Sequence, residues 1–161
     1  MDFATADLCD AHGNSVKIAQ PIFHSYGGTR AFAGPVRTLR VWEDNSLVRA
    51  ALERNGEGAV LVVDGGGSLN CALLGDLLAA LAVKNGWAGI VLNGCIRDSK
   101  EIATMPLGVL AIATQPRKSR KQNRGEEDVT VNIAGIAIGP GDYLYADEDG
   151  LIVAEEVLGA D

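Results

Sequence analysis

The chain has 161 residues, of which 47% are hydrophobic and 22% charged, and its formal net charge is −7. This length predicts a single domain over residues 1–161, long enough to bury roughly two-thirds of the surface of the unfolded chain. The acidic charge argues against direct binding of nucleic acid, and the short apolar runs and the absence of a signal sequence predict a cytoplasmic protein that does not enter the membrane.

Strands and helices alternate in the first half of the chain. Residues 37–42 alternate in hydropathy and predict a half-exposed strand, and Asn45 or Ser46 can then begin a helix that Gly56 closes. Residues 59–63 are a buried-looking strand, and residues 64–67, Asp-Gly-Gly-Gly, form the turn after it. That turn invites a nucleotide or methyl-donor interpretation, but the residues that follow break both glycine patterns, so a tight turn explains it as well.

A helix and a strand then complete a βαβ unit. Gly75-Asp76 precedes leucines at helical spacing, and Asn85-Gly86 supplies the stop, which predicts a helix of about three turns. Residues 89–92 are a short apolar strand, and Arg97 and Asp98 lie just past its carboxyl end. Helix starts and the carboxyl ends of strands are where α/β folds place their chemistry.

The second half of the chain is mainly β structure. Residues 109–113 predict a strand, and residues 129–138, 143–145 and 151–153 predict three more. Between them, residues 117–124 form a basic run followed by acidic residues. We interpret this run as a solvated loop outside the catalytic region, with docking of a partner or a phosphate as the alternative.

One motif extends across this unit. Asp76 is followed after twenty intervening residues by Arg97-Asp98 and then, after two more, by Glu101. This pattern resembles the D-x20-R-D-x2-E/D motif of the metal-dependent 4-hydroxy-4-methyl-2-oxoglutarate aldolases, a family that also contains RraA, the regulator of ribonuclease E activity. Further stretches that resemble the family are residues 5–10, 62–67, 139–142 and 146–150.

The resemblance implies a fold and an activity. The fold is the α/β class, with a single-domain swivelling β/β/α architecture, and the usual assembly is a homotrimer. The activity is cleavage of a small 2-oxo acid, 4-hydroxy-4-methyl-2-oxoglutarate, to two pyruvates through a metal-stabilised pyruvate enolate, with decarboxylation of oxaloacetate as a side activity. The cofactor is a divalent cation, Mg²⁺ or Mn²⁺. A lysine Schiff base is the other route to such an enolate, but Lys84 and Lys100 lack the apolar setting that depresses a lysine pKa.

The resemblance also implies roles for individual residues. Asp98 is the direct protein ligand to the metal, Arg97 holds the pyruvyl carboxylate, and Asp76 and Glu101 order the waters around the metal. The backbone amides at the helix start receive the anionic end of the substrate; they belong to Gly75, Asp76, Leu77 and Leu78. Taken singly, these side chains are typical of a surface ion pair, a helix cap and a solvated helix residue, and only their joint spacing favours the functional interpretation.

The regulatory relatives provide an alternative, in which the chain binds a ribonuclease E scaffold segment as its partner and performs no catalysis. Regulatory members can lack the acidic residue that Glu101 supplies here, so its presence favours the enzyme. The longer aldolases also send an acidic residue into the neighbouring subunit's site. Glu155 and Glu156 are the candidates for that role in this chain.

Overall fold

The structure, a computed structural model, describes residues 2–159 and is a mixed α/β fold. The helices are α1 (Thr5–His12), α2 (Ser46–Leu52), α3 (Asp76–Lys84) and α4 (Ser99–Ile102), with a 3-10 turn, η1, at Gly13–Ser15. The strands are β1 (Lys17–Ile18), β2 (His24–Ser25), β3 (Phe32–Arg40), β4 (Val60–Asp64), β5 (Ala72–Leu74), β6 (Gly89–Ile96), β7 (Gly108–Thr114), β8 (Glu126–Glu127), β9 (Val131–Ile133), β10 (Ile136–Ile138), β11 (Tyr143–Asp147) and β12 (Gly150–Ala154).

The centre of the main sheet is parallel. Strands β3, β4, β6 and β7 lie side by side in that order, and Val60 of β4 pairs with Val36 on one side and Gly89 on the other. Strands β11 and β12 continue the sheet beyond β3 in antiparallel fashion. The predicted βαβ unit is therefore confirmed, because β4 and β6 are parallel neighbours with α3 between them in the sequence.

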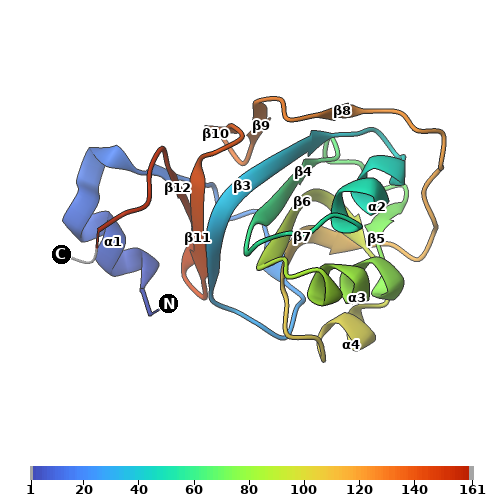
Figure 1. Cartoon of the computed structure of the whole chain (residues 1–161), viewed down its shortest axis with the longest axis horizontal. Coiled ribbons are helices and arrows are strands. Elements are labelled where there is room, and N and C mark those ends of the chain that lie inside the picture. The colour runs from blue at the N-terminus through green and yellow to red at the C-terminus, as the bar shows by residue number, and fades with distance from the viewer. Residues whose placement is uncertain (1, 160–161) are drawn as a thin grey trace.

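The sheet is covered on both faces. Helices α2, α3 and α4 lie on one face (Figure 1), where Leu39, Leu92 and Trp87 belong to the larger buried core. On the other face, Val62 and Val91 pack with residues of the β9–β10 hairpin and of β11 and β12 in a second core. Two β layers and one helical layer are the expected β/β/α arrangement.

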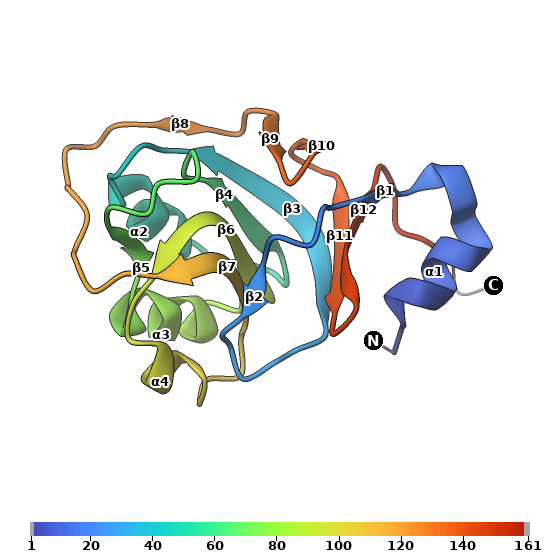
Figure 2. The same ribbon diagram turned by 180° about the vertical axis from the view of Figure 1, so that it is seen from behind.

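Helix α1 packs away from the other helices, at the opposite end of the molecule beside β11 and β12 (Figure 1). Its first turn is held by Asp147, whose carboxylate accepts hydrogen bonds from the Thr5 backbone amide at 2.7 Å and the Thr5 hydroxyl at 2.6 Å. The chain then returns along the back of the sheet through β1 to β2 (Figure 2). Among residues 2–159, no helix is both long and apolar enough to span a membrane.

Three strand predictions need correction. The strand predicted at residues 37–42 is β3, which begins earlier, at Phe32, and ends at Arg40. Residues 129–138 are not one strand but the β9–β10 hairpin, because Ala134 and Gly135 both adopt positive φ angles, 49° and 78°, and reverse the chain. The strand predicted at residues 89–92 continues to Ile96, where a register shift between Leu92 and Cys95 in its pairing with β7 lets it pass through Asn93 and Gly94.

Candidate active site

Arg97 and Asp98 directly follow β6, as predicted, and the neighbouring short strand β5 brings the start of α3 alongside them. Leu74 of β5 pairs with Ile96, and its carbonyl accepts a hydrogen bond from the Arg97 amide at 2.9 Å. The chain then turns sharply, since Asp98 adopts a left-handed conformation with φ 58° and ψ 38°. This turn directs the Asp98 side chain back toward α3.

Asp98 caps helix α3. Its Oδ2 accepts a hydrogen bond from the backbone amide of Asp76, the first residue of the helix, at 3.0 Å. Gly75 allows this approach, because a Cβ atom at that position would lie 2.9 Å from the same carboxylate oxygen and 3.5 Å from the Arg97 side chain. The next two amides of the helix, of Leu77 and Leu78, have no hydrogen-bond acceptor within residues 2–159 and remain able to bind an anion.

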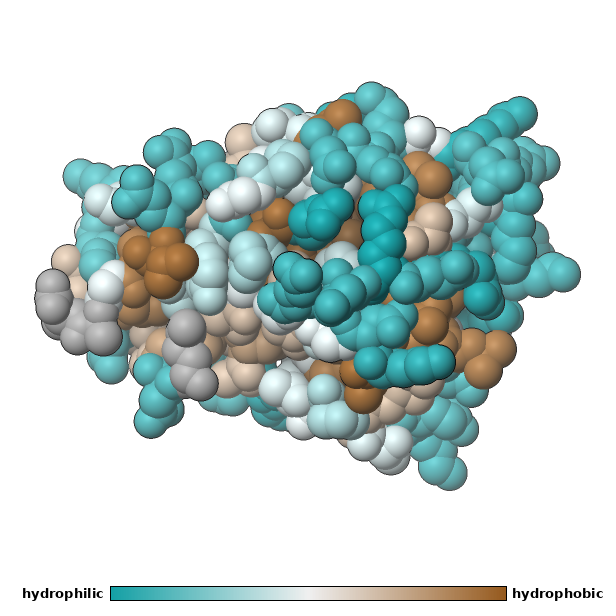
Figure 3. Space-filling model, viewed as in Figure 1, coloured by the Kyte–Doolittle hydropathy of each residue, from teal (hydrophilic) through white to brown (hydrophobic). Residues whose placement is uncertain are grey.

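These groups share one surface hollow of about 240 Å³. It lies on the side of the molecule that carries α2 and α3, where hydrophilic side chains cover most of the face drawn in Figure 3. The hollow is lined by Asn45, Arg49, Ala72, Gly75, Asp76, Leu77, Leu78, Arg97, Asp98, Lys118, Ser119 and Lys121. All the predicted site residues except Glu101 are therefore brought together.

The hollow is locally basic in an acidic protein. Its lining contains two arginines and two lysines against only two carboxylates, whereas the whole chain has a net charge of −7. The ion pairs within residues 2–159 lie elsewhere and join Arg37 to Asp128, Arg40 to Glu126 and Arg54 to Glu127. The cations of the hollow are thus free of carboxylate partners in the described part of the chain, which suits the binding of an anion.

The basic run at residues 117–124 was predicted to be a solvated loop outside the catalytic region; most of its residues are exposed, but the structure places part of the run beside the predicted site residues. Lys118 and Lys121 line the same hollow as Arg97. The loop is also fixed to the fold, because the Arg117 carbonyl accepts a hydrogen bond from the Ala72 amide at 2.8 Å and Ser119 is buried. Contacts with residues distant in the sequence hold this polar segment in place, and its polarity alone did not reveal them.

Glu101 lies on α4, one turn after Asp98, and is exposed rather than part of the lining. Sequence reasoning also missed Arg49, which is exposed on α2 at the edge of the face that buries Val48, Ala51 and Leu52. An arginine on the polar face of an amphipathic helix carries no signal of its own. Lys118 and Lys121 were visible only as part of the basic run.

A divalent cation is compatible with this donor set. Among residues 2–159, no group of three or more His, Cys, Asp and Glu side chains is arranged to hold a metal ion without other ligands. However, Asp98 Oδ2 is bound to the Asp76 amide and Oδ1 has no hydrogen-bond donor within that range, so one carboxylate oxygen is available. Mg²⁺ commonly takes only one or two carboxylates and keeps several waters, which fits Asp98 with Asp76 beside it.

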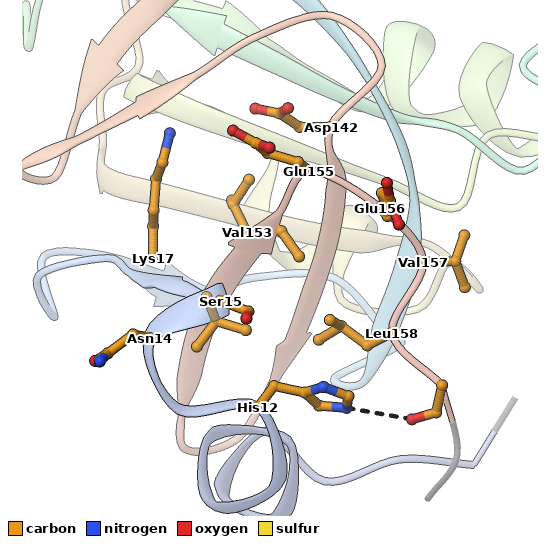
Figure 4. Close-up of a pocket in the computed structure, with 13 residues that line it drawn as sticks. His12, Asn14, Ser15, Lys17, Asp142, Val153, Glu155, Glu156, Val157 and Leu158 are labelled. Atoms are coloured by element: carbon orange, nitrogen blue, oxygen red, sulfur yellow. Dashed lines mark hydrogen bonds between the residues drawn. The ribbon is translucent and has the colours of Figure 1, made fainter.

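A larger hollow, of about 530 Å³, lies at the other end of the molecule between η1 and the segment after β12. Figure 4 shows the carboxylates of Asp142 and Glu155 close together on one side, Lys17 opposite them, and His12 bonded to the Gly159 carbonyl at 3.3 Å. Glu155 and Glu156 line this hollow. Strands β11, β3 and β4 separate β12 from β6 in the sheet, so these glutamates are remote from Arg97 of the same chain.

The chain matches a known protein family over most of its length. Residues 5–153 match the family described as RraA-like, Aldolase/RraA. The chain belongs to the RraA-like family. A relative from Aromatoleum aromaticum, which bears the name "Putative 4-hydroxy-4-methyl-2-oxoglutarate aldolase", is 58% identical over 158 residues, covering 98% of this chain and 99% of the relative.

Two solved structures share the fold of this chain. A protein of Geobacillus kaustophilus described as an S-adenosylmethionine:2-dimethylmenaquinone methyltransferase has a TM-score of 0.96 and 51% identity, covering 99% of each chain. The RNA-processing inhibitor RraA from Thermus thermophilis also has a TM-score of 0.96, with 48% identity over 99% of this chain and 97% of that one. Relatives of one fold thus carry names from three functional classes: an aldolase, a methyltransferase and an RNA-processing inhibitor. The fold alone does not identify the function, which must be argued from the residues of the site.

Proposed function

We propose that this chain is a divalent-metal-dependent aldolase that cleaves 4-hydroxy-4-methyl-2-oxoglutarate to two pyruvates. The observation that carries the proposal is the basic hollow in which Arg97 and Asp98 face the amino terminus of α3. The substrate is a small dianion with a carboxylate at each end. A hollow with two more cations than carboxylates, in a chain of net charge −7, is suited to such a ligand.

Arg97 binds the pyruvyl half of the substrate. Its planar guanidinium can donate two parallel hydrogen bonds to the carboxylate and the neighbouring keto oxygen. The free amides of Leu77 and Leu78 and the positive end of the α3 dipole add to this binding. The Arg97 Nη1 donates to the Pro116 carbonyl at 3.4 Å, a contact that helps to orient the side chain at the hollow.

The chemistry needs a sink for electrons and an acceptor for one proton. Asp98 would hold a divalent cation, Mg²⁺ or Mn²⁺, which would supply Lewis-acid stabilisation of negative charge on the keto oxygen. The bond between C3 and C4 breaks, its electron pair moves into the pyruvate enolate, and the C4 hydroxyl becomes the carbonyl of the first pyruvate as it loses its proton. A proton returned to C3 of the enolate then gives the second pyruvate, so no net proton is gained or lost. Asp76 is the carboxylate in the hollow beside Asp98, and we assign to it the acceptance of that proton through an ordered water, with Glu101 as an outer carboxylate.

The second carboxylate of the substrate lies against the other cations of the hollow. Lys118 and Lys121 come from the basic loop and Arg49 comes from α2. Their charges select a 2-oxo acid with a carboxylate at both ends over one with a single carboxylate. Oxaloacetate has the same two carboxylates, and loss of carbon dioxide from it passes through the same enolate, so oxaloacetate decarboxylation is the expected side activity.

A homotrimer is the assembly that we propose for this enzyme. Glu155 and Glu156 are remote from Arg97 within one chain, so either could reach a hollow only in another copy. The hollow is open to solvent on the side of Leu77, which is 74% exposed, and a neighbouring copy would cover such an apolar side chain.

The relatives named as RNA-processing inhibitors support a second candidate, a regulator that binds a ribonuclease E scaffold segment. The outward side chains of the basic loop, such as Arg117 and Arg120, are exposed and offer charges to an acidic partner. The methyltransferase name has less support in the geometry. The turn after β4 is closed on itself, since Asp64 Oδ1 accepts hydrogen bonds from the Gly66 amide at 2.9 Å and from Asn93 at 3.2 Å.

The test is release of pyruvate from 4-hydroxy-4-methyl-2-oxoglutarate and from oxaloacetate, with and without Mg²⁺ or Mn²⁺. The proposal predicts two pyruvates per molecule of the first substrate and one per molecule of the second, both abolished by a chelator. Binding of a ribonuclease E scaffold segment without metal-dependent pyruvate release would support the regulator instead.

A further inference from the structure

The basic loop is held by one buried carboxylate. Asp44, which is only 2% exposed, lies just before α2, and its Oδ1 accepts a hydrogen bond from the Ser46 amide at 2.9 Å. Its Oδ2 accepts one from the Gln122 amide of the loop at 2.6 Å. Asp44 therefore joins the start of α2, which carries Arg49, to the segment that carries Lys121.

The backbone around Asp44 reinforces this connection. The Arg120 amide donates to the Glu43 carbonyl at 2.9 Å, and the Asn45 amide donates to the Arg120 carbonyl at 3.1 Å. Glu43 itself adopts a positive φ of 54°, and its carboxylate accepts hydrogen bonds from the Ser68 hydroxyl at 2.6 Å and the Asn70 side chain at 2.8 Å. Residues 43–46 thus form a clip for the loop, held in an uncommon backbone conformation by residues that follow β4.

The charge on Asp44 is part of the clip. Burial by itself would raise the pKa of this carboxyl, but the hydrogen bonds from Ser46, Gln122 and Arg124 outweigh burial and lower its pKa below the ordinary value. The group is therefore ionised at neutral pH, and its two hydrogen bonds to backbone amides are charge-assisted. An asparagine in its place has only one acceptor oxygen, so it could accept a hydrogen bond from only one of the two backbone amides, those of Ser46 and Gln122.

We propose that Asp44 is a positioning residue that sets the enzyme's preference for substrates with two carboxylates. It fixes residues 120–122 against the start of α2, so that Lys118, Lys121 and Arg49 line the same hollow. Asp44 does not touch the substrate. This inference rests on the proposed function, because it names what the basic side of that same hollow recognises.

The clip and the pyruvyl-binding end of the site are separate. Arg97 and Asp98 are held by β5, β6 and α3, through the Leu74 carbonyl and the Asp76 amide. The Arg97 side chain also donates to the Pro116 carbonyl, but this part of the chain is fixed by the hydrogen bond from the Ala72 amide to the Arg117 carbonyl, which does not involve Asp44. Loosening the loop should therefore weaken contact with the distal carboxylate while the pyruvyl half still binds. A general loss of stability would affect both ends alike, which makes selectivity the readout that separates positioning from a merely structural role.

The experiment compares the wild type with Asp44→Asn on two substrates. One is 4-hydroxy-4-methyl-2-oxoglutarate; the other is 4-hydroxy-2-oxopentanoate, which has the same pyruvyl half and no distal carboxylate. We expect the KM of the variant for 4-hydroxy-4-methyl-2-oxoglutarate to rise about tenfold, which corresponds to the loss of one charged contact. The kcat for this substrate, and the KM for 4-hydroxy-2-oxopentanoate, should change less than about twofold. An equal change in kcat/KM for both substrates would overturn the proposal.

A matched control is Asp147→Asn. Asp147 also accepts hydrogen bonds from backbone and side chain, and those bonds likewise lower its pKa against the effect of burial, but it caps α1 at the other end of the molecule. This variant should lose stability without altering the ratio of kcat/KM between the two substrates. A similar change of ratio in Asp147→Asn would show that the effect is not specific to the loop.

A binding measurement distinguishes failure of this inference from failure of the proposed function. Calorimetry with 2-oxoglutarate, which has two carboxylates and no 4-hydroxyl to cleave, is compared with pyruvate in the presence of Mn²⁺. The inference expects the wild type to prefer 2-oxoglutarate and Asp44→Asn to lose about tenfold of that preference, whether or not the wild type cleaves any substrate. If the wild type shows no such preference, or the variant retains it, the positioning role is wrong even for an active aldolase.

Discussion

The Asp98 carboxylate accepts a hydrogen bond from the Asp76 backbone amide at 3.0 Å, so the proposed metal ligand is also the cap of helix α3. The two ends of the D-x20-R-D motif are thus joined directly. One oxygen of Asp98 orients the carboxylate on the helix, and the other remains for a cation. A mutation of Asp98 consequently tests two properties, stability and catalysis, which two variants can separate.

Asp98→Asn and Asp98→Ala should both abolish metal-dependent pyruvate release, because neither provides an anionic ligand. Alanine also removes the cap of α3. In addition, alanine is disfavoured at φ 58°, where its side chain cannot form the local hydrogen bond that aspartate or asparagine can, so the variant should lower the free energy of unfolding by about 1–2 kcal/mol. Asparagine tolerates this conformation and keeps an acceptor, so its cost should be a few tenths of a kcal/mol. Urea denaturation and the pyruvate assay measure both. Turnover near that of the wild type in either variant, with metal present, contradicts the assignment.

Arg97→Lys should weaken binding of oxalate, a mimic of the pyruvate enolate, about tenfold or more, since lysine keeps the charge but loses the planar fork. Competitive inhibition by oxalate at fixed Mn²⁺ measures the change. The variant should keep its stability because the Arg97 side chain makes only one hydrogen bond in the described chain, to Pro116. Unchanged oxalate inhibition would mean that Arg97 is not the anion-binding group.

Gly75→Ala should reduce activity at least tenfold and lower the free energy of unfolding by about 1 kcal/mol, the cost of a weakened helix cap. The backbone at Gly75, φ −128°, is accessible to alanine, but the new Cβ would lie 2.9 Å from Asp98 Oδ2 and displace that carboxylate. The matched control is Gly139→Ala, where the nearest atom would be 3.4 Å away, on Thr130, in ordinary contact. The control should retain wild-type turnover, and an active Gly75→Ala would show that the Asp98 position is not critical.

Replacing Lys118 and Lys121 with serine should raise KM for 4-hydroxy-4-methyl-2-oxoglutarate about tenfold, because these side chains line the hollow. The paired control replaces Arg117 and Arg124, which belong to the same loop but do not line the hollow, and should change KM less than about twofold. Equal effects of the two double variants would place the distal carboxylate elsewhere.

Acid should loosen the basic loop through Asp44. The folded-state pKa of Asp44 lies below its ordinary value of 3.8, so on acidification the unfolded chain takes up a proton first and unfolding becomes more favourable. The stability that the charge provides is complete above the unfolded pKa and is lost as pH falls through the folded one. The difference in stability between the wild type and Asp44→Asn should therefore shrink below about pH 4. A difference that stays constant with pH, measured by urea unfolding, contradicts an ionised Asp44.

Local signals in the sequence were sufficient for the centre of the fold. Gly75-Asp76 and Asn85-Gly86 mark both ends of α3, and the neighbouring apolar runs predict the parallel strands β4 and β6. Asn93 and Gly94 obscured the true length of β6, because both residue types are uncommon in strands. Pairing with β4 on one side and β7 on the other keeps this segment in the sheet despite them.

The site was predictable only in part. The motif placed Arg97 and Asp98 at the end of β6, but the basic side of the hollow depends on hydrogen bonds between residues 43–46 and residues 120–123, almost eighty positions apart. No local pattern encodes such a contact. Asp44, next to Glu43 in a polar stretch, likewise carried no signal of burial, since its burial is a consequence of the loop that it holds.

The central claim is that Asp98 binds a metal and Arg97 binds a pyruvate enolate. Because formation of the enolate removes a proton from the methyl group of pyruvate, exchange of methyl hydrogen for solvent deuterium tests this claim directly. Pyruvate is incubated with the protein in D₂O, and deuterium entering its methyl group is followed by NMR. We predict exchange that requires Mg²⁺ or Mn²⁺, is blocked by oxalate and is absent in Asp98→Asn. Metal-independent exchange, no exchange by the wild type, or full exchange by Asp98→Asn would contradict the assignment.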